Sequence, residues 1–326
     1  MDTVLVGDVG GTSCRFAVAH RSGGEITLTA FAKYQNDDHT RFSGALNTFL
    51  ADLGTEAPQG QPPTTALFAL AGPLQEDGSV TLTNRDWPTI HPDDLKSRTG
   101  LARVTLVNDF AAMARAVPEM PPAAFETILP GTPKPSAPIL VTGPGTGFGV
   151  STLITERDGR YRVMTGEGGH AAYAAHTPRE AEIAACLAAE HGFISTEAVV
   201  SGAWLQPVFD IVSDLHGRAR ANLPAADILA RADAGDPVCV EVCELRGRAI
   251  MGAAGDAALI TGAQGGVVLT GGVAERMGKW LRSADAEIRF RGRGARTPWM
   301  APIPVSVLHA DEAPLTGAAA LAFDLA

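Results

Sequence analysis

The feature that most constrains the fold is a strand, a glycine-rich turn and a second strand at the start of the chain. Residues 3–8 are apolar and β-branched, Gly10-Gly11-Thr12 forms a tight turn, and residues 15–18 alternate as in a strand. A second glycine-rich loop, residues 143–149, again lies between strand-like runs, the first of them at 139–142. Glycine lets a backbone approach a phosphate closely, so both turns are candidate phosphate loops.

Neither loop fits the common nucleotide motifs. Both lack the lysine of GxxxxGK[ST], and neither matches GxGxxG in register, so P-loop and dinucleotide-binding interpretations fail. In the first loop, Thr12 can donate to a phosphate and Asp8 can hold Mg²⁺ through water. An ordinary acidic hairpin turn would have a similar sequence, because Asp-Gly and Gly-Gly turns are common. Gly271-Gly272 is a weaker third signal, because strand-to-helix packing also uses such glycines.

The first third of the chain predicts further strands and a helix. A third strand is expected over 26–34, a helix over 43–53 with Gly54 as its stop, and a strand over 66–71. The short apolar run 104–107 places Asn108-Asp109 at the carboxyl end of a strand, where open α/β sheets bind ligands.

The remaining chain alternates strands with helices. Residues 130–138 contain four prolines and are the best candidate for a linker between domains. Thr177 to Glu180 forms a capping box, which predicts a helix to about residue 190, and Asp236-Pro237 starts a longer helix. Strands are expected at 265–270 and 304–308. This order predicts an α/β architecture in two parts.

Composition excludes several classes of protein. With 326 residues the chain is long enough for about two domains. Its formal charge of −10 argues against a nucleic-acid partner, and the basic stretch 289–296 is expected to be a solvated loop. The start lacks a basic n-region, and no run approaches the roughly 18 apolar residues of a membrane span, so we expect a soluble cytoplasmic protein with no membrane partner. The cysteines form no CxxC pair and are expected to be reduced thiols: Cys14, Cys186, Cys239 and Cys243.

A third group of residues is acidic and polar. Carboxylates accept hydrogen bonds from adjacent hydroxyls, as a polyhydroxyl substrate requires, and phosphoryl transfer needs one further carboxylate to take the proton of the attacking hydroxyl. Each residue also has a simpler interpretation: Glu197 as a helix-start residue, His170 as a satisfied polar side chain, and Asp109 as the cap of a helix beginning near Ala111. The candidates are Asn84, Asn108, Asp109, Glu167, His170 and Glu197.

Taken together and in order, these motifs resemble the bacterial glucokinase family, within the hexokinase and actin-like ATPase superfamily. The resemblance covers essentially the whole chain, and the ordered set is far more specific than any single member. The motifs are Asp8 to Thr12 with Arg15, Leu70 to Pro73, Thr83-Asn84 with Trp87, Val107 to Phe110, Gly143 to Gly149, Gly166 to His170, Glu197 with Ser201-Gly202, and Thr270 to Val273.

The resemblance implies a fold and a reaction. It implies two α/β domains with ribonuclease-H-like cores flanking a cleft, a small one at 1–118 plus 311–326 and a large one at 119–310. It implies phosphorylation of glucose to glucose 6-phosphate by Mg-ATP, the first step of glucose catabolism, in a homodimer. A kinase for mannose or fructose and a catalytically silent sugar-binding actin-like protein are the alternatives.

The resemblance also implies roles for the residues. Asp109 is the catalytic base, and Asn84, Asn108, Asp109, Glu167, His170 and Glu197 bind the sugar. Asp8, Gly10, Gly11 and Thr12 form the first phosphate loop, with Asp8 holding Mg²⁺ through water. Gly143, Gly145, Thr146, Gly147 and Gly149 form the second loop, and Gly271 and Gly272 contact the adenosine.

Two departures from the family pattern are mild. Ser13 stands where Asn is usual, and Pro144 stands where a small residue is usual. The related ROK sugar kinases share a Gly-Glu-x-Gly-His element but carry a cysteine-rich zinc motif after it. Here no cysteine follows His170 until Cys186, which disfavours that subgroup and its zinc.

Overall fold

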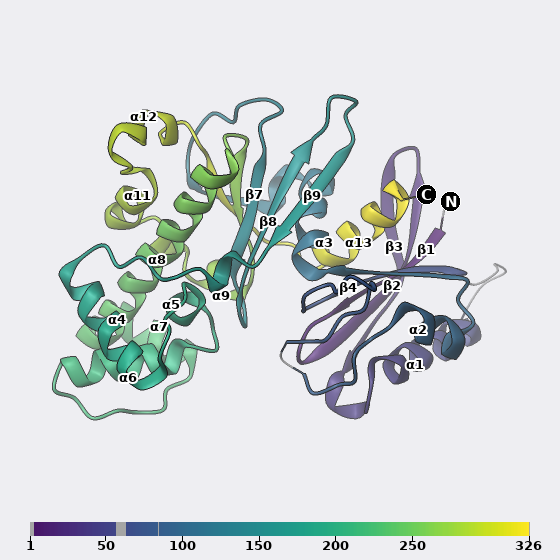
Figure 1. The fold of residues 1–326 in the computed structure, drawn as a ribbon, viewed down its shortest axis with the longest axis horizontal. Coiled ribbons are helices and arrows are strands. Elements are labelled where there is room, and N and C mark those ends of the chain that lie inside the picture. Colours follow the sequence, from purple (N-terminus) through teal and green to yellow (C-terminus); the bar gives the residue numbers. More distant parts are fainter. Residues whose placement is uncertain (1–2, 57–62, 84, 326) are drawn as a thin grey trace. The chain divides into compact units, whose positions relative to one another are not determined.

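The structure, a computed structural model, describes residues 3–56, 63–83 and 85–325. It divides the chain into two compact units, Met1–Pro122 with Ala310–Ala326, and Ala123–His309. Each unit contains one mixed β-sheet with helices packed on it (Figure 1). The predicted α/β class is confirmed.

The first unit has a five-stranded sheet in the order β3-β2-β1-β4-β5. The first three strands form an antiparallel meander, and β4 and β5 continue it parallel to β1. The carboxyl ends of β1, β4 and β5 therefore lie at one edge of the sheet. The strands are β1 (Thr3–Val9), β2 (Ser13–Ser22), β3 (Glu25–Gln35), β4 (Thr65–Leu70) and β5 (Arg103–Asn108).

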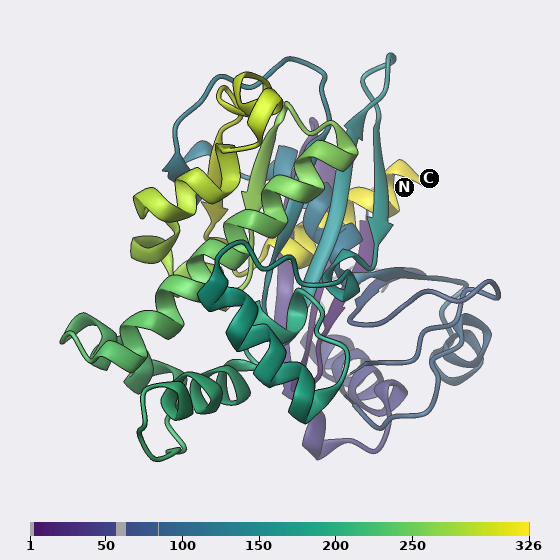
Figure 2. The ribbon, with the colours of Figure 1, turned by 60° about the vertical axis from the view of Figure 1, so that its left-hand side comes forward.

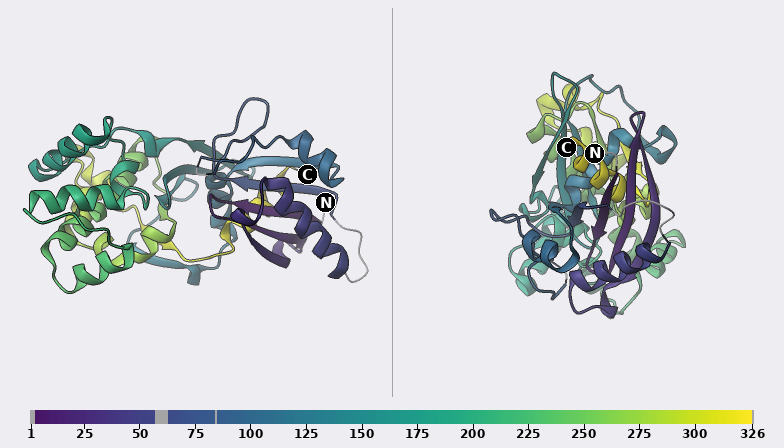
Figure 3. Two further views of the ribbon diagram at one scale, coloured as in Figure 1. Left: turned by 90° about the horizontal axis from the view of Figure 1, so that it is seen from below. Right: turned by 90° about the vertical axis from the view of Figure 1, so that its right-hand side faces the viewer.

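Strand alternation gives this sheet two buried faces. Leu5 and Val9 pack with α1 (Phe42–Glu56) and α2 (Pro92–Thr99), whereas Val4 and Val6 pack with α13 (Ala313–Asp324). The C-terminal helix α13 returns to lie beside α3 (Asp109–Ala116), as Figure 1 shows, and Figure 3 shows β1 to β3 side by side. Short 3-10 turns complete the unit at Asn36–Asp38 and Val117–Glu119. A further 3-10 turn, Pro122–Ala124, spans the boundary between the two units.

The second unit repeats this strand order. Read from one edge, its sheet runs β9-β8-β7-β10-β11. Strands β7, β8 and β9 form an antiparallel meander, and β10 and β11 continue it parallel to β7. Strand β6 adds an antiparallel edge beside β11. Both glycine-rich turns therefore occupy the same place, between the first two strands of a meander. The strands are β6 (Phe125–Leu129), β7 (Ile139–Pro144), β8 (Phe148–Thr155), β9 (Tyr161–Gly166), β10 (Gly266–Leu269) and β11 (Val305–Leu308).

The longest described helix, α8 (Pro237–Thr261), packs on this second sheet and against α11 (Ala284–Arg291), as Figure 2 shows. It begins where the Asp236 side chain accepts hydrogen bonds from Val238 N and Cys239 N, and it ends at Gly262, whose φ is 69°. No helix in the described part of the chain is long and apolar enough to cross a membrane. The other helical segments are Gly168–His170, α4 (Pro178–His191), α5 (Glu197–Val200), α6 (Leu205–Leu215), α7 (Ala225–Asp233), α9 (Gly272–Arg276), α10 (Gly278–Leu281), α11 (Ala284–Arg291), Gly294–Arg296 and α12 (Thr297–Met300).

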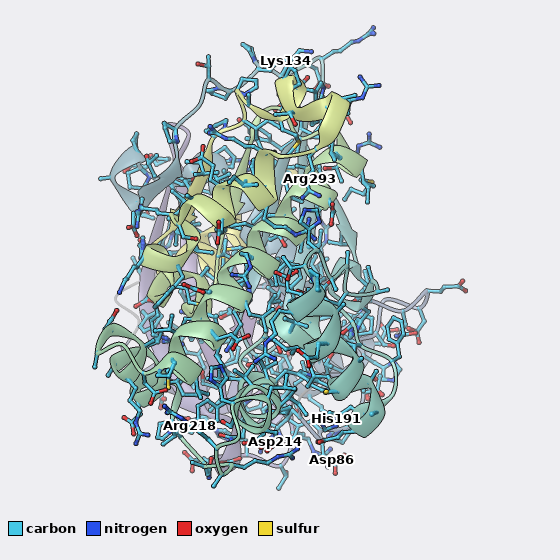
Figure 4. The ribbon with its side chains drawn as sticks, turned by 90° about the vertical axis from the view of Figure 1, so that its left-hand side faces the viewer. Asp86, Lys134, His191, Asp214, Arg218 and Arg293 are labelled. Carbon is cyan, nitrogen blue, oxygen red and sulfur yellow. The ribbon has the colours of Figure 1, made fainter. Side chains whose placement is uncertain are left out.

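Two local predictions are wrong, the second only in part, in ways that packing explains. The proline-rich segment 130–138 does not separate the units: β6, which precedes it, pairs with β11 and so belongs to the second unit. The basic stretch 289–296 is a solvated loop only in its second half, because residues 289–291 belong to α11. Arg289 is buried, and Arg293 pairs with Asp256 at 2.5 Å, against α8 (Figure 4).

Helix ends also differ from the sequence prediction. Helix α1 continues through Gly54 to Glu56, and α3 begins at Asp109, earlier than expected from Ala111. The α3 boundary matters because it places Asp109 in the first turn of a helix.

Candidate active site

The first glycine turn, between β1 and β2, is closed by a hydrogen bond from Gly10 N to Ser13 O at 3.1 Å. Asp8 lies opposite Arg15 in the strand register, and Arg15 Nε donates to Asp8 Oδ2 at 2.9 Å. Arg15 also donates to Asp311 O at 2.6 Å, in the segment that leads into α13. The half-buried Asp8 carboxylate is therefore held in place at the mouth of the turn.

Asn36, which no sequence motif marks, holds the same turn through two hydrogen bonds. Its Nδ2 donates to Gly10 O at 2.8 Å, and its backbone N–H donates to Thr12 O at 2.9 Å. Cys14 Sγ donates to Asn36 Oδ1 at 3.0 Å, and burial raises the pKa of that thiol to about 12, so it stays protonated and remains a donor. Asn36 is fully buried, and nothing in the local pattern of its neighbours signals this role.

Asn36 is also bonded to the segment around Trp87, which carries one of the family motifs. Arg85 donates to Asn36 O at 2.8 Å and lies over the Trp87 ring, while Trp87 Nε1 donates to His39 O at 3.1 Å. The segment around Trp87 is thus joined to the first glycine turn through Arg85. Asn84, the predicted sugar ligand in this segment, lies outside the described residues.

Asn108 and Asp109 lie where β5 becomes α3. Asn108 is the N-cap: its Oδ1 accepts from Phe110 N at 3.0 Å, and its Nδ2 donates to Gly72 O at 3.2 Å. Asp109 Oδ1 also accepts from Phe110 N, at 3.0 Å, and its side chain is half-buried. Because β1, β4 and β5 are parallel and in register, Asp8 and Asp109 lie at the same edge of the sheet.

The second glycine turn, in the other unit, connects β7 and β8. Gly143 is required by packing, because a Cβ there would lie 2.0 Å from Thr270 O. At Gly145, in contrast, a Cβ would meet nothing within 4 Å, as is also true at Gly10 of the first turn. Gly145 N donates to Gly147 O at 2.9 Å, and Thr146 is exposed. The open part of the second turn is therefore Gly145 and Thr146.

Glu197 packs directly against this second turn. Its Oε2 accepts from Phe148 N at 2.7 Å, and a Cβ at Gly147 would lie 2.5 Å from the same oxygen. Glu197 is the first residue of α5, as one simpler interpretation held, but its carboxylate caps no amide of that helix in the described hydrogen bonds. It bonds to the loop instead.

Of the predicted residues, Glu167 immediately precedes a 3-10 turn that packs on β8, and His170 is the last residue of that turn. A Cβ at Gly169 would lie 2.2 Å from Phe148 O, so glycine allows this close approach, and both polar side chains are exposed. Thr196 N donates to Ala171 O at 2.8 Å, which joins this turn to the segment that carries Glu197. Glu167, His170 and Glu197 thus come from adjoining segments.

Gly271 and Gly272 complete the group in the second unit. Gly271 has a φ of 93°, which favours glycine, and a Cβ there would lie 2.7 Å from Pro144 O in the second turn. Gly272 is the first residue of α9. The structure therefore brings together the predicted residues within each unit: a glycine turn with Asp8 and Asp109 in the first, and a glycine turn with Glu197, the Glu167–His170 turn and Gly271-Gly272 in the second.

Two α/β units of one strand order, each with a glycine turn between the first two strands of its sheet, define a protein of the actin-like ATPase fold. Comparison with known proteins gives the family. The model of the family described as Glucokinase matches residues 5–324. A glucokinase of Aromatoleum aromaticum is 37% identical over 317 residues, which are 97% of this chain and 93% of that protein. This chain therefore belongs to the glucokinase family.

Solved structures agree with this assignment. The crystal structure of a glucokinase from an Antarctic psychrotroph has a TM-score of 0.85 and 30% identity, covering 99% of both chains. A ROK family glucokinase from Streptomyces griseus, solved in complex with glucose and AMPPNP, has a TM-score of 0.63 at 19% identity and covers 98% of both chains, a likeness that shows the fold alone.

Proposed function

We propose that this protein transfers the γ-phosphoryl group of ATP to glucose, forming glucose 6-phosphate in the first step of glucose catabolism. The observation that carries this proposal is the match to the glucokinase family over nearly the whole chain. Such a reaction needs sites that bind the phosphates and a carboxylate that acts as the base. This chain has two lysine-free glycine turns and a carboxylate, Asp109, at the end of a strand. The ROK family glucokinase with bound glucose and AMPPNP adds support, since it shares the fold.

Asp109 is the proposed base. A carboxylate at the end of β5 can accept the proton of the attacking sugar hydroxyl, which makes that oxygen the stronger nucleophile. Asn108 is oriented by Gly72 O and Phe110 N, so its amide is fixed before substrate binds. The full proposed sugar-binding set is Asn84, Asn108, Asp109, Glu167, His170 and Glu197.

The two turns are proposed to hold the nucleotide. Backbone N–H groups of glycine turns bind phosphate oxygens without a lysine, and Gly10 and Gly145 leave space for such an approach. The phosphate contacts would come from Asp8, Gly10, Gly11 and Thr12 of the first turn and from Gly143, Gly145, Thr146, Gly147 and Gly149 of the second. Gly271 and Gly272 would contact the adenosine.

Magnesium fits the residues around the first turn. Mg²⁺ usually keeps several waters and uses one or two carboxylates with substrate phosphates. Asp8 offers one half-buried carboxylate, held at Oδ2 by Arg15, and no group of three His, Cys, Asp or Glu side chains that could hold a metal occurs among the described residues. Asp8 would therefore hold the ion through water, and the ion would neutralise charge on the phosphates.

We further propose that the protein is a cytoplasmic homodimer, with a small α/β domain at 1–118 plus 311–326 and a large α/β domain at 119–310. The division into units at 122/123 and 309/310 supports these boundaries. Light scattering of the purified protein tests the dimer: a mass of one chain of 33.8 kDa would contradict it.

An assay that couples ADP release to a detectable signal, run across a panel of hexoses, tests the function. Glucose-dependent turnover is expected, and Asp109→Ala should lower kcat at least about 100-fold, since a positioned base supplies about 10²–10⁴. The control is Asp158→Asn, which removes an exposed carboxylate in the β8–β9 turn and should leave kcat unchanged. Turnover with mannose or fructose but not glucose, or binding without turnover, would contradict the proposal, as would near-normal activity of Asp109→Ala.

A further inference from the structure

Arg246 is a buried cation in the second unit, and among the described residues it has no acidic partner. It lies on α8 with 3% of its surface exposed, and it donates through one nitrogen to Val200 O at 2.6 Å and Ser201 O at 2.8 Å. Within the described part of the chain, its Nε has no hydrogen-bond partner and no carboxylate lies within ion-pair distance. Its neighbour Arg248 differs, since it pairs with Glu180 at 2.8 Å.

The two backbone hydrogen bonds of Arg246 do not by themselves require a full positive charge. Removing a cation from water without a paired anion costs several kcal/mol, and a neutral side-chain amide could bond the same carbonyls at less cost. Burial lowers the pKa of Arg246 to about 10, yet at neutral pH the guanidinium still carries its proton. The positive charge is therefore retained at the C-terminal end of α5, with no carboxylate beside it among the described residues.

Arg246 is joined to the second glycine turn through the Ser201–Gly202 peptide group. It bonds to Ser201 O, and the next residue, Gly202, donates through its N–H to Gly145 O at 2.8 Å. Val200, its other partner, ends α5, the helix that begins with Glu197. A chain of short contacts thus leads from the guanidinium to Gly145, the open glycine of the turn.

We propose that Arg246 is a positioning residue for the nucleotide, which holds Ser201 and Gly202 against Gly145 and supplies positive charge behind a phosphate loop that has no lysine. This inference rests on the proposed function, because it requires that the second turn bind the phosphates of a nucleotide. Its physical basis is that a charge in the protein interior is screened much less than one in water. Because a nucleoside carries no charge and a phosphate does, the effect of this charge should fall on the phosphate groups.

Binding of ADP and of adenosine, measured by titration calorimetry, separates charge from structure. Arg246→Gln should weaken ADP binding at least about tenfold and change adenosine binding less than about twofold, whereas Arg246→Lys should keep ADP binding within about threefold of wild type. The control is Arg291→Gln, which also removes a guanidinium that donates to a backbone carbonyl, Pro130 O at 2.6 Å. It should bind both ligands as wild type does.

Equal weakening of ADP and adenosine by Arg246→Gln, or unchanged ADP binding, would overturn the inference. If the glutamine variant does not fold, the lysine variant decides, because loss of ADP affinity beyond about threefold while the charge is kept contradicts the proposal. Failure of the premise that the second turn binds a nucleotide looks different: wild-type protein would then bind neither ADP nor adenosine.

Discussion

Replacing Gly317 with alanine tests how the structure holds the helix that carries Asp109. Gly317 lies within α13, and a Cβ there would lie 1.8 Å from Ala112 O and 3.0 Å from Ala116 N. Both of these atoms belong to α3, whose first residue is Asp109. Since ordinary contacts of a Cβ begin near 3.4 Å, α3 and α13 must separate by more than an ångström to admit the methyl group.

Two effects of this substitution oppose each other. Alanine is favoured over glycine within a helix by about 1 kcal/mol, whereas overpacking a filled interior costs about 1–3 kcal/mol. The obstacle at Gly317 is backbone and not the end of a flexible side chain, so the cost should reach or exceed the upper end of that range. We expect the free energy of unfolding to fall by about 2 kcal/mol and Tm by about 4–8 °C.

Activity should fall as well. A misplacement of about 1 Å can cost about 100-fold in rate, so we expect kcat of Gly317→Ala to drop by about 10- to 100-fold. Gly44→Ala is the matched control in the same unit, because it lies in α1 and its new Cβ would meet only ordinary contact, 3.5 Å from His39 Nδ1. It should be as stable as wild type or up to about 1 kcal/mol more stable, with unchanged kcat.

Urea unfolding and steady-state kinetics of the two variants provide the measurement. The reasoning fails if Gly317→Ala is as stable and as active as wild type, or if both alanine variants change stability in the same direction. In either case the close approach of α13 to α3 would not be what positions Asp109.

Three further predictions concern other parts of the structure. Asn36→Ala removes the side-chain hydrogen bond to Gly10 O, which we expect to stabilise the binding conformation of the turn by about 1.4 kcal/mol. KM for Mg-ATP should therefore rise by about tenfold, and an unchanged KM in steady-state kinetics would contradict this. For Glu180, burial raises the pKa, but hydrogen bonds from Arg248 and His176 N outweigh it and the net pKa lies below 4.5. Its stabilisation is therefore present above that pH and is lost as pH falls further, so Glu180→Gln should be less stable than wild type at pH 7 in urea unfolding and lose less stability on acidification; parallel pH profiles would argue against it. In native protein at pH 8, a thiol reagent should modify half-buried Cys186 but not Cys14, whose pKa is about 12 because of burial; rapid labelling of Cys14 would refute that.

Local signals in the sequence determined several elements of this protein. The capping box at Thr177 predicts α4, and in the structure Thr177 Oγ1 accepts from Glu180 N at 3.1 Å. Asp236-Pro237 likewise starts α8. The glycine turns were recognisable because each is flanked by strands in the sequence. Such features depend on neighbours a few residues apart, which is why the sequence alone predicts them.

The sequence also determined the family, since the ordered motifs span nearly the whole chain. The roles of Asp109 and the other site residues stay predictions. What the structure adds is how residues far apart in the chain support them. Arg85 reaches Asn36 across 49 positions, and Arg246 reaches Val200 across 46.

Tertiary structure alone decided these supports, together with the addition of β6 to the second sheet and the burial of Arg289. No periodicity or motif marks Asn36 or Arg246, because each has its role through partners brought near by packing of the whole unit. A buried polar group must find its partners wherever the fold places them, and the local sequence carries no record of that place.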